Sequence, residues 1–441
     1  MSTSGFTVDV DHNQYLPEGG REVSAIATVT SEGAPAAVGA SWSGGTGADG
    51  GSAEIIIVDC SGSMDVPHSK ITQARAATTA AIDVVHDGAA FAVIAGTSFA
   101  KPVYPANGTM AMASPQTRAE ARQAVNGLRA GGGTAIGKWL QLASQVFRTS
   151  PATLRHAILL TDGRNQHETP EELSAAIGAS EGYFTCDCRG VGTDWEVSEL
   201  RKISSALLGS VDIIPDPAGL AADFEQMMRA AMSKQVADVS LRVWTPQQAE
   251  VQFVKQVAPE VADLSARRVT ISAQVGDYPT GAWGPGESRD YHVGIRVSPG
   301  FVGQEMLAAR VSLVVNAGGQ SEVLGQGLVR ALWTSDEGLS TKINSRVAHY
   351  TGQAELASVI QEGLEARKQG DEETATARLG RAVVLAKQSG NENTAKLLAK
   401  VVDVVDEATG TVRLKKKVDD ADEMALDTRS TKTVRVRKDH S

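Results

Sequence analysis

An Asp-x-Ser-x-Ser motif, formed by Asp59, Ser61 and Ser63, directly follows four consecutive β-branched residues at 55–58. Such a run is typical of a strand that is buried on both faces of a parallel sheet. Open α/β sheets hold ligands in the loops that leave the carboxyl ends of such strands. Gly62 permits a tight turn that brings alternate side chains round to one point. Because carboxylate and hydroxyl oxygens suit hard cations, the motif predicts a Mg²⁺ site.

Two later stretches offer matching oxygen ligands. Thr134 follows three glycines at 131–133 and precedes helix-forming sequence. Asp162 ends a second apolar run, at residues 157–161. Asp, Ser and Gly are also common in ordinary turns at strand ends, which is the alternative interpretation. The order of the three parts, each on the expected kind of element, favours the metal site.

Together these parts resemble the metal-ion-dependent adhesion site of the von Willebrand factor A (VWA) domain, whose pattern is Asp-x-Ser-x-Ser, then Thr, then Asp. The resemblance implies a Rossmann-like fold that binds Mg²⁺, with Mn²⁺ or Ca²⁺ as alternatives. It implies that Ser61, Ser63 and Thr134 contact the ion directly or through water. Asp59 and Asp162 would anchor the ion, at least partly through water.

The charge of this ligand set points to a function. Its five side chains carry only two negative charges, so a bound Mg²⁺ keeps a net attraction for one more anion and has a free coordination position. A partner's Asp or Glu side chain can fill that position, which is the mechanism that the VWA resemblance implies. We therefore predict a scaffold or adaptor that binds a protein partner through the metal.

Two other functions compete with this one. The chain could be a regulatory VWA subunit of an AAA+ ATPase of the chelatase or MoxR type, although no Walker A sequence occurs here. It could also be a metal-dependent phosphoesterase, which needs a positioned base or nucleophile beside the ion. Asp65, His68 and His167 are the nearby candidates in sequence, and neither histidine has an evident paired acid or nucleophile. We predict no enzymatic activity.

Composition limits the class of protein. A chain of 441 residues favours two to four domains, and a net charge of -10 disfavours a general nucleic-acid binder. The N-terminus lacks the basic and apolar segments of a signal peptide, and no apolar run reaches the length of a membrane span. The cysteines are few and odd in number, which favours a reducing compartment and a cytoplasmic location: Cys60, Cys186 and Cys188. For Cys186 and Cys188, strand packing is the favoured interpretation over metal binding.

The hydrophobic pattern predicts several domains. Strand–helix alternation over residues 53–236 indicates a doubly wound parallel sheet, the VWA domain. Residues 237–338 show only strand-like segments with turn signals, which indicate a β-sandwich. These segments are 239–244, 251–257, 268–275, 289–297, 307–316 and 322–333. Residues 1–52 hold two more strands, at 6–10 and 23–30, and then a Gly-rich linker at 31–52. We expect these strands to complete the sandwich, so that the VWA domain is an insertion.

The C-terminal part is predicted to be a bundle of three helices at residues 339–410, followed by a charged tail at 411–441. Over its whole length the chain is similar to cytoplasmic VWA proteins of actinobacteria, through stretches such as 15–20, 58–63, 190–195 and 276–283. Such proteins accompany Ser/Thr kinases, phosphatases and phosphothreonine-binding FHA domains. The resemblance suggests that Thr428, Thr431 or Thr433 in the tail is phosphorylated and bound by an FHA partner.

Overall fold

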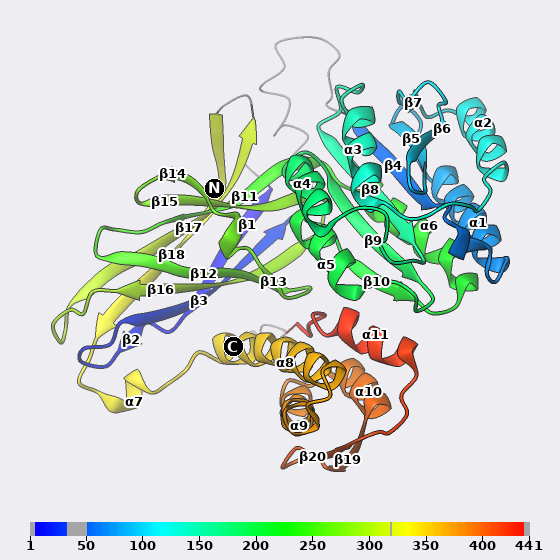
Figure 1. Ribbon diagram of the computed structural model, residues 1–441. Helices are drawn as coiled ribbons and strands as arrows, with labels where there is room; N and C mark the ends of the chain where they lie inside the picture. Colours follow the sequence, from blue (N-terminus) through cyan, green and yellow to red (C-terminus); the bar gives the residue numbers. More distant parts are fainter. Residues whose placement is uncertain (1–4, 33–50, 318–319, 436–441) are drawn as a thin grey trace. The chain divides into compact units, whose positions relative to one another are not determined.

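The computed structural model describes residues 5–32, 51–317 and 320–435 (Figure 1). The chain divides into two compact units. One covers Gly39–Ala237, and the other joins Met1–Val38 to Asp238–Ser441. The predicted linker at 31–52 lies mostly outside the described residues. None of the helices in the described part of the chain is long and apolar enough to cross a membrane.

The first unit alternates strands with helices, as predicted. Its strands are β4 (Ser52–Asp59), β5 (Ala90–Gly96), β6 (Ala100–Tyr104), β7 (Ala111–Met112), β8 (Leu154–Thr161), β9 (Thr185–Val191) and β10 (Val211–Ile214). Its helices are α1 (Ser69–Asp83), α2 (Pro115–Asn126), α3 (Ile136–Phe147), α4 (Pro170–Ser180), α5 (Val197–Ala206) and α6 (Leu220–Met232). Capping boxes at Ser114 and Thr169, each followed by proline, begin α2 and α4.

The sheet of this unit has the strand order β10-β9-β8-β4-β5-β6, with β7 also paired to β5. The pairs from β10 to β5 are parallel, whereas β6 and β7 run antiparallel to β5. Helices cover both faces (Figure 1). Ile56 and Val58 of β4 pack into a core that contains residues of α1, α2 and α6. The chain leaves β4 towards β5 and later returns to β8 on the other side, so the strand order reverses beside β4.

The second unit contains a two-sheet β-sandwich. One sheet has the order β1-β3-β16-β12-β13 and the other the order β14-β15-β11-β17-β18-β2. The N-terminal β3 pairs with β16 over nine residues, so the N-terminal strands belong to the sandwich as predicted. The strand bounds are Phe6–His12 (β1), Tyr15–Leu16 (β2), Glu22–Ser31 (β3), Val236–Trp244 (β11), Ala249–Ala258 (β12), Ala262–Asp263 (β13), Val269–Ser272 (β14), Val275–Trp283 (β15), Ser288–Val297 (β16), Glu305–Ala317 (β17) and Gln320–Trp333 (β18).

One strand prediction in the sandwich is wrong. The predicted strand at 268–275 is two strands, because the chain turns after Ser272 and β15 runs on from Val275 to Trp283. The sequence of β15 contains Gly276, Pro279 and Gly281, which are turn residues by type. The burial of Tyr278 and Trp283 in the core keeps this stretch extended despite those residues.

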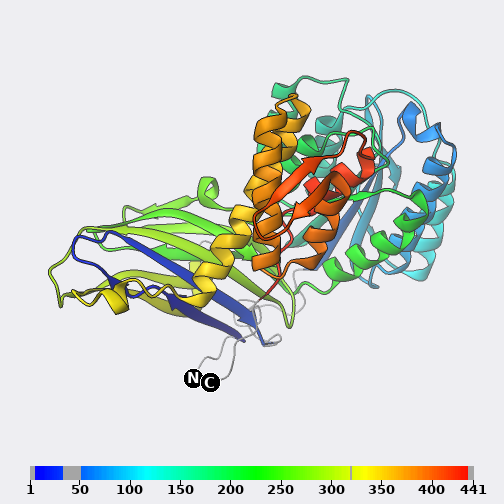
Figure 2. The ribbon, with the colours of Figure 1, turned by 90° about the horizontal axis from the view of Figure 1, so that it is seen from below.

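The C-terminal elements pack on one another through a separate apolar core. They are α7 (Glu337–Ser340), α8 (Ser345–Lys368), α9 (Glu372–Gln388), α10 (Glu392–Val401), β19 (Val402–Asp406), β20 (Thr411–Leu414) and α11 (Asp420–Arg429). The first turns of α8 lie against the sandwich, where Val347 and Tyr350 pack with Ile26 and Val257, and its later turns pack on α9 (Figure 2).

The third predicted helix ends earlier than expected. The sequence pattern places Val405 on its buried face, but α10 ends at Val401 and Val405 is 57 % exposed on β19. Val402, Val404 and Val405 are β-branched, and pairing with β20 is open to them once the chain turns back. The spacing of apolar residues over so few positions fits a helix or a strand, so the hydrophobic pattern alone did not distinguish between them.

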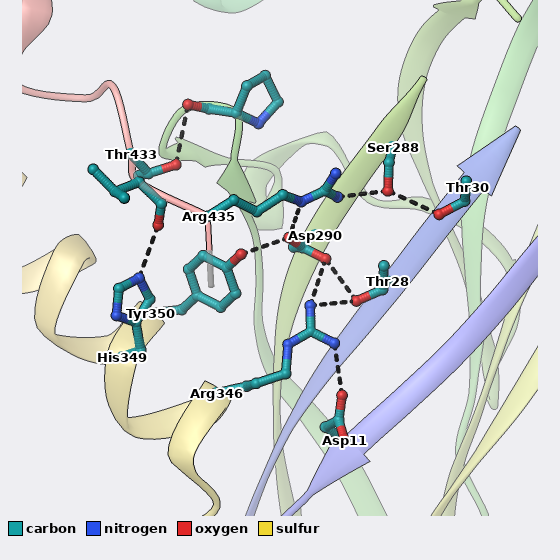
Figure 3. Close-up of polar contacts among 12 residues, drawn as sticks. Asp11, Thr28, Thr30, Ser288, Asp290, Arg346, His349, Tyr350, Thr433 and Arg435 are labelled. Atoms are coloured by element: carbon teal, nitrogen blue, oxygen red, sulfur yellow. Dashed lines mark hydrogen bonds and ion pairs between the residues drawn. The ribbon is translucent and has the colours of Figure 1, made fainter. Parts of the chain in front are cut away.

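The charged tail predicted at 411–441 contains a strand and a helix in its described residues, 411–435. After β20 and α11, Thr433–Arg435 run along α8 and the sandwich (Figure 3). Val434 N–H donates to Gln353 Oε1 at 2.7 Å, and Arg435 reaches Asp290 at 2.9 Å. Of the three predicted phosphoacceptors, Thr428 is buried in α11. The Thr433 hydroxyl donates to the Pro259 carbonyl at 3.0 Å.

Candidate metal centre

Asp59 is the last residue of β4 and is fully buried, at the edge where the strand order reverses. Asp162 follows β8, the neighbouring parallel strand, and is also fully buried. Neighbouring parallel strands end at the same edge of a sheet, and ligands bind where their order reverses. The two carboxylates therefore lie at the position where an open α/β sheet accepts a ligand.

Backbone hydrogen bonds join the first two predicted loops. Gly62 N–H donates to the Gly132 carbonyl at 2.9 Å, and Gly131 N–H donates to the Cys60 carbonyl at 2.8 Å. This pairing fixes the start of the Asp-x-Ser-x-Ser loop against the glycine loop that carries Thr134.

The second and third loops are joined through His167. Its backbone N–H donates to the Thr134 carbonyl at 3.0 Å, and its Nδ1 accepts from Thr134 N–H at 3.2 Å. The ring fills the space beside Gly133, where a Cβ atom would lie 1.9 Å from His167 Cε1. His167 is exposed, as the sequence suggests, but it holds the Thr134 backbone as well as facing solvent. At the start of α3, Ile136 N–H donates to Asn165 Oδ1 and Gly137 N–H donates to Glu168 Oε1, so these helix-terminal N–H groups also have side-chain acceptors.

The five predicted ligand residues lie together. Ser63 Oγ donates to Asp162 Oδ1 at 2.6 Å and lies 2.9 Å from Ser61 Oγ. A Cβ atom at Gly163 would lie 3.2 Å from Ser63 Oγ and 3.5 Å from Thr134 Oγ1, so these two hydroxyls face the same small residue. Asp59 Oδ1 accepts the Ser61 N–H at 2.7 Å, which closes the loop on its first residue.

The buried surroundings of Asp59 stabilise its charged form poorly. Burial raises the pKa of Asp59 to about 6, against the hydrogen bonds from Ser61 and Thr161, which lower it. Thr161 was not singled out by the sequence, and its hydroxyl donates to Asp59 Oδ2 at 2.6 Å. Both oxygens of Asp59 therefore have donors that orient the side chain.

A second residue that sequence reasoning missed is Lys70, in the first turn of α1. Its side chain is 7 % exposed, and its Nζ donates to Asp162 Oδ2 at 2.7 Å. The more exposed Asp194 carboxylate lies 3.6 Å from the same nitrogen. In the sequence, the indication that Lys70 could lie near the site was its position seven residues after Ser63. A charged residue at the start of a helix is more often solvated, so this signal is weak.

The donor set fits a hard divalent cation. Three neutral hydroxyl oxygens stand beside two carboxylates whose positions are fixed by hydrogen bonds, and oxygen-only sets of this kind suit Mg²⁺ or Mn²⁺. In residues 5–32, 51–317 and 320–435 no group of three or more His, Cys, Asp and Glu side chains could hold a metal ion. The five-residue cluster is not such a group, because three of its members contribute neutral hydroxyl oxygens.

The structure pairs two of the three side chains considered for catalysis, although neither histidine has an evident acid partner in the sequence. His68 and Asp65 pair with each other on the exposed surface. His167 Nδ1 is occupied by a backbone amide. Burial raises the pKa of the Cys60 thiol to about 12, which keeps it neutral. Cys186 and Cys188 on β9 are free and buried, as expected from strand packing.

Comparisons with known proteins agree with this architecture. The profile of the von Willebrand factor type A domain matches residues 53–213, and that of the von Willebrand factor type A C-terminal domain matches residues 384–430. A von Willebrand factor type A structure from Catenulispora acidiphila shares 52% identity and covers 98% of each chain, with a TM-score of 0.91.

A second solved structure shares only the fold. It is the ArnB paralog VWA2 from Sulfolobus acidocaldarius, with 14% identity over 96% of this chain and 98% of that chain, and a TM-score of 0.54. No protein with a curated description matched significantly. On the full-length similarity to the Catenulispora protein and the matched domain profile, this chain belongs to the von Willebrand factor type A family.

Proposed function

We propose that the chain is a metal-dependent protein-binding protein rather than an enzyme. Its metal ligands would be Asp59, Ser61, Ser63, Thr134 and Asp162. The observation that supports this most directly is the meeting of three loops, in which Ser63 Oγ touches Asp162 and shares the space beside Gly163 with Thr134 Oγ1. When bound, Mg²⁺ would supply positive charge and an open coordination position for a partner's carboxylate.

The chain's own residues favour an incoming acid. Ser63 is half-buried and Gly62 is exposed, whereas Ser61, Thr134 and both carboxylates are buried, so the cluster is most accessible from the side of Ser63. Two exposed apolar side chains lie close to these loops in the chain or through a hydrogen bond. Val66, 74 % exposed, follows Ser63, and Phe99, 73 % exposed, follows Ser98, whose hydroxyl accepts from Gly133 N–H at 3.0 Å. The partner in this proposal presents an Asp or Glu beside an apolar residue. A cytoplasmic adaptor role and FHA- or kinase-linked partners remain predictions of the sequence.

A pull-down from host lysate tests the proposal. Partners should be retained with Mg²⁺ and released by EDTA, and Asp59→Ala should retain none. Asp65→Ala is the matched control, because Asp65 is an exposed carboxylate of the same loop that pairs only with His68, and it should behave as the unmodified chain. Equal retention under all conditions would contradict the proposal. An ATPase among the captured proteins would favour the chelatase-type alternative, and phosphodiester turnover lost in Asp59→Ala would favour the phosphoesterase.

Removing the Thr161 hydroxyl should weaken metal binding without touching a proposed ligand. Thr161→Val keeps the shape of the side chain but leaves Asp59 Oδ2 without its donor at 2.6 Å. Loss of a partner that orients a ligand typically lowers metal affinity by about 10–100-fold. Titration with Mn²⁺, followed by the electron paramagnetic resonance of the free ion, measures the change. An unchanged affinity in the folded variant would show that Asp59 does not need this hydroxyl.

A further inference from the structure

We propose that Lys70 is a built-in counter-ion that weakens metal binding at this centre and, in return, strengthens the binding of the partner's carboxylate to the metal-loaded site. The inference rests on the proposed function, because it concerns the same five ligand residues. It assigns a role to a residue outside the Asp-x-Ser-x-Ser, Thr and Asp pattern.

The position of Lys70 is fixed by the fold. The residue lies in the first turn of α1, and its backbone N–H donates to the Pro67 carbonyl at 2.9 Å. Its side chain is 7 % exposed and passes Gly192, where a Cβ atom would lie 3.7 Å from Lys70 Cε. The ammonium group is therefore buried where it meets Asp162, and it is not a mobile surface charge.

The ammonium group completes the hydrogen bonding of one carboxylate. Asp162 Oδ1 accepts from Ser63 at 2.6 Å and Oδ2 accepts from Lys70 at 2.7 Å. Asp59 has no such cation, since its oxygens accept from the Ser61 amide and the Thr161 hydroxyl. The two carboxylates are thus unequal, and only that of Asp162 is partly neutralised by the protein.

The charge count gives the consequence. The two ligand carboxylates and the ammonium carry a single negative charge, so a divalent ion would leave the centre with a single positive charge. The Asp194 carboxylate, 3.6 Å from the ammonium, is 75 % exposed and is screened by solvent, so it is not counted. One carboxylate from a partner then brings the centre to neutrality. Without Lys70, the two carboxylates alone would neutralise the ion. Contrary to the expectation from the ligand charges alone, an incoming acid would then meet no net positive charge. The same ammonium repels the metal ion but attracts the acid.

Lys70→Gln tests this, because glutamine keeps a hydrogen-bond donor and removes the charge. A charge a few ångströms away typically changes an ionic equilibrium by one to three powers of ten, and the partial exposure of Ser63 beside the site favours the lower value. We expect Lys70→Gln to bind Mn²⁺ about tenfold more tightly and acetate, added to the Mn²⁺-loaded protein, about tenfold more weakly. Free Mn²⁺ is followed by electron paramagnetic resonance, and acetate by the water-proton relaxation of the bound ion.

Three further variants make the result specific. Lys70→Met removes the charge in a side chain of similar length and should give the same two signs, so the test does not depend on one variant folding. Lys70→Arg keeps the charge and should keep both affinities within about threefold. Lys138→Gln is the matched control, because Lys138 is an exposed lysine that lies over the Phe99 ring and makes its hydrogen bond to the Ser98 carbonyl. It should change neither affinity by more than about twofold.

The outcomes separate the two proposals. Opposite changes in the two affinities support the role of Lys70. Parallel weakening of both in Lys70→Gln and Lys70→Met would show that Lys70 only positions Asp162, and unchanged affinities would show that its charge has no effect. Either result overturns this inference while leaving the proposed function in place. Absence of Mn²⁺ uptake by the unmodified chain and by every variant would overturn both.

Discussion

Replacing His156 by alanine is expected to lower the free energy of unfolding of the VWA unit by about 3–5 kcal/mol, because it leaves two carboxylates without their shared cation. His156 Nδ1 lies 2.8 Å from Glu54 Oε2, and Nε2 lies 2.9 Å from Asp187 Oδ2. The Glu54 side chain is 2 % exposed and that of Asp187 is 23 % exposed. These residues come from β8, β4 and β9, so the imidazole links the three central strands of the sheet.

Because the charge of His156 changes with pH, the stability lost in His156→Ala should also depend on pH. Burial by itself would lower the pKa of His156, but the carboxylates of Glu54 and Asp187 outweigh it and raise the pKa to about 10. For Asp187, burial is outweighed by the contacts with His156, Arg189 and Ser210, which lower the pKa of its carboxyl. A histidine whose pKa is raised on folding stabilises fully below its unfolded pKa of about 6.5, and this contribution disappears as the pH rises towards 10. The difference between the unmodified chain and His156→Ala should therefore be largest near pH 6 and should shrink at alkaline pH.

Native-state hydrogen exchange of the β8 amides measures this effect in the full chain, because it reports on that unit without assuming two-state unfolding of all domains. His86→Ala is the matched control, since His86 is an exposed histidine of the same unit and its loss should change stability by no more than about 0.5 kcal/mol. A loss below about 1 kcal/mol in His156→Ala, or a difference that grows with pH, would contradict the assignment of a buried cation.

Asp290→Ala is expected to detach the chain end and weaken the packing of α8 on the sandwich, at a cost of about 3–5 kcal/mol. Asp290 is fully buried and accepts from Thr28 at 2.6 Å, Tyr350 at 2.6 Å, Arg346 at 3.0 Å and Arg435 at 2.9 Å (Figure 3). Burial raises the pKa of this carboxyl, but hydrogen bonds from Arg435, Thr28 and Tyr350 outweigh burial and lower it. The variant would leave the buried guanidinium of Arg346 with Asp11 as its remaining carboxylate partner.

Two further variants should destabilise the junction of α8 and the sandwich less than Asp290→Ala does. The Arg435 side chain is 40 % exposed, so Arg435→Ala should cost only about 1 kcal/mol. Arg330→Ala removes a surface ion pair of the same sandwich, with its side chain 52 % exposed, and should have almost no effect. Limited proteolysis measures the outcome, and cleavage between α7 and α8 should be fastest in Asp290→Ala. Equal cleavage of all three variants would show that Asp290 does not hold this junction.

The candidate metal centre could be located from the sequence because its signals are local. A run of β-branched residues fixes β4, a carboxylate at its end marks the sheet edge, and alternate hydroxyls in a glycine-containing turn must face one point. The same reasoning found Asp162 at the end of β8 and Thr134 before α3, and the structure brings all of these residues together. The N-terminal strands were assigned to the sandwich from strand count alone, and their pairing with β16 agrees.

Other features depend on contacts between residues far apart in the sequence. Lys70 meets Asp162 across 92 positions, Thr161 meets Asp59 across 102, and Arg435 meets Asp290 across 145. Each of these side chains is of a type that is usually solvated or part of a turn, so its sequence neighbours give no indication of its partner. The folded tail and the early end of α10 have the same origin, because charged or β-branched residues adopt the structure that the facing surface stabilises. The sequence by itself determined which oxygen atoms surround the proposed ion, since strand ends and turns are encoded locally. The tertiary structure decided that Lys70 partly neutralises Asp162 and that Thr161 orients Asp59, since only packing brings these groups within hydrogen-bonding distance.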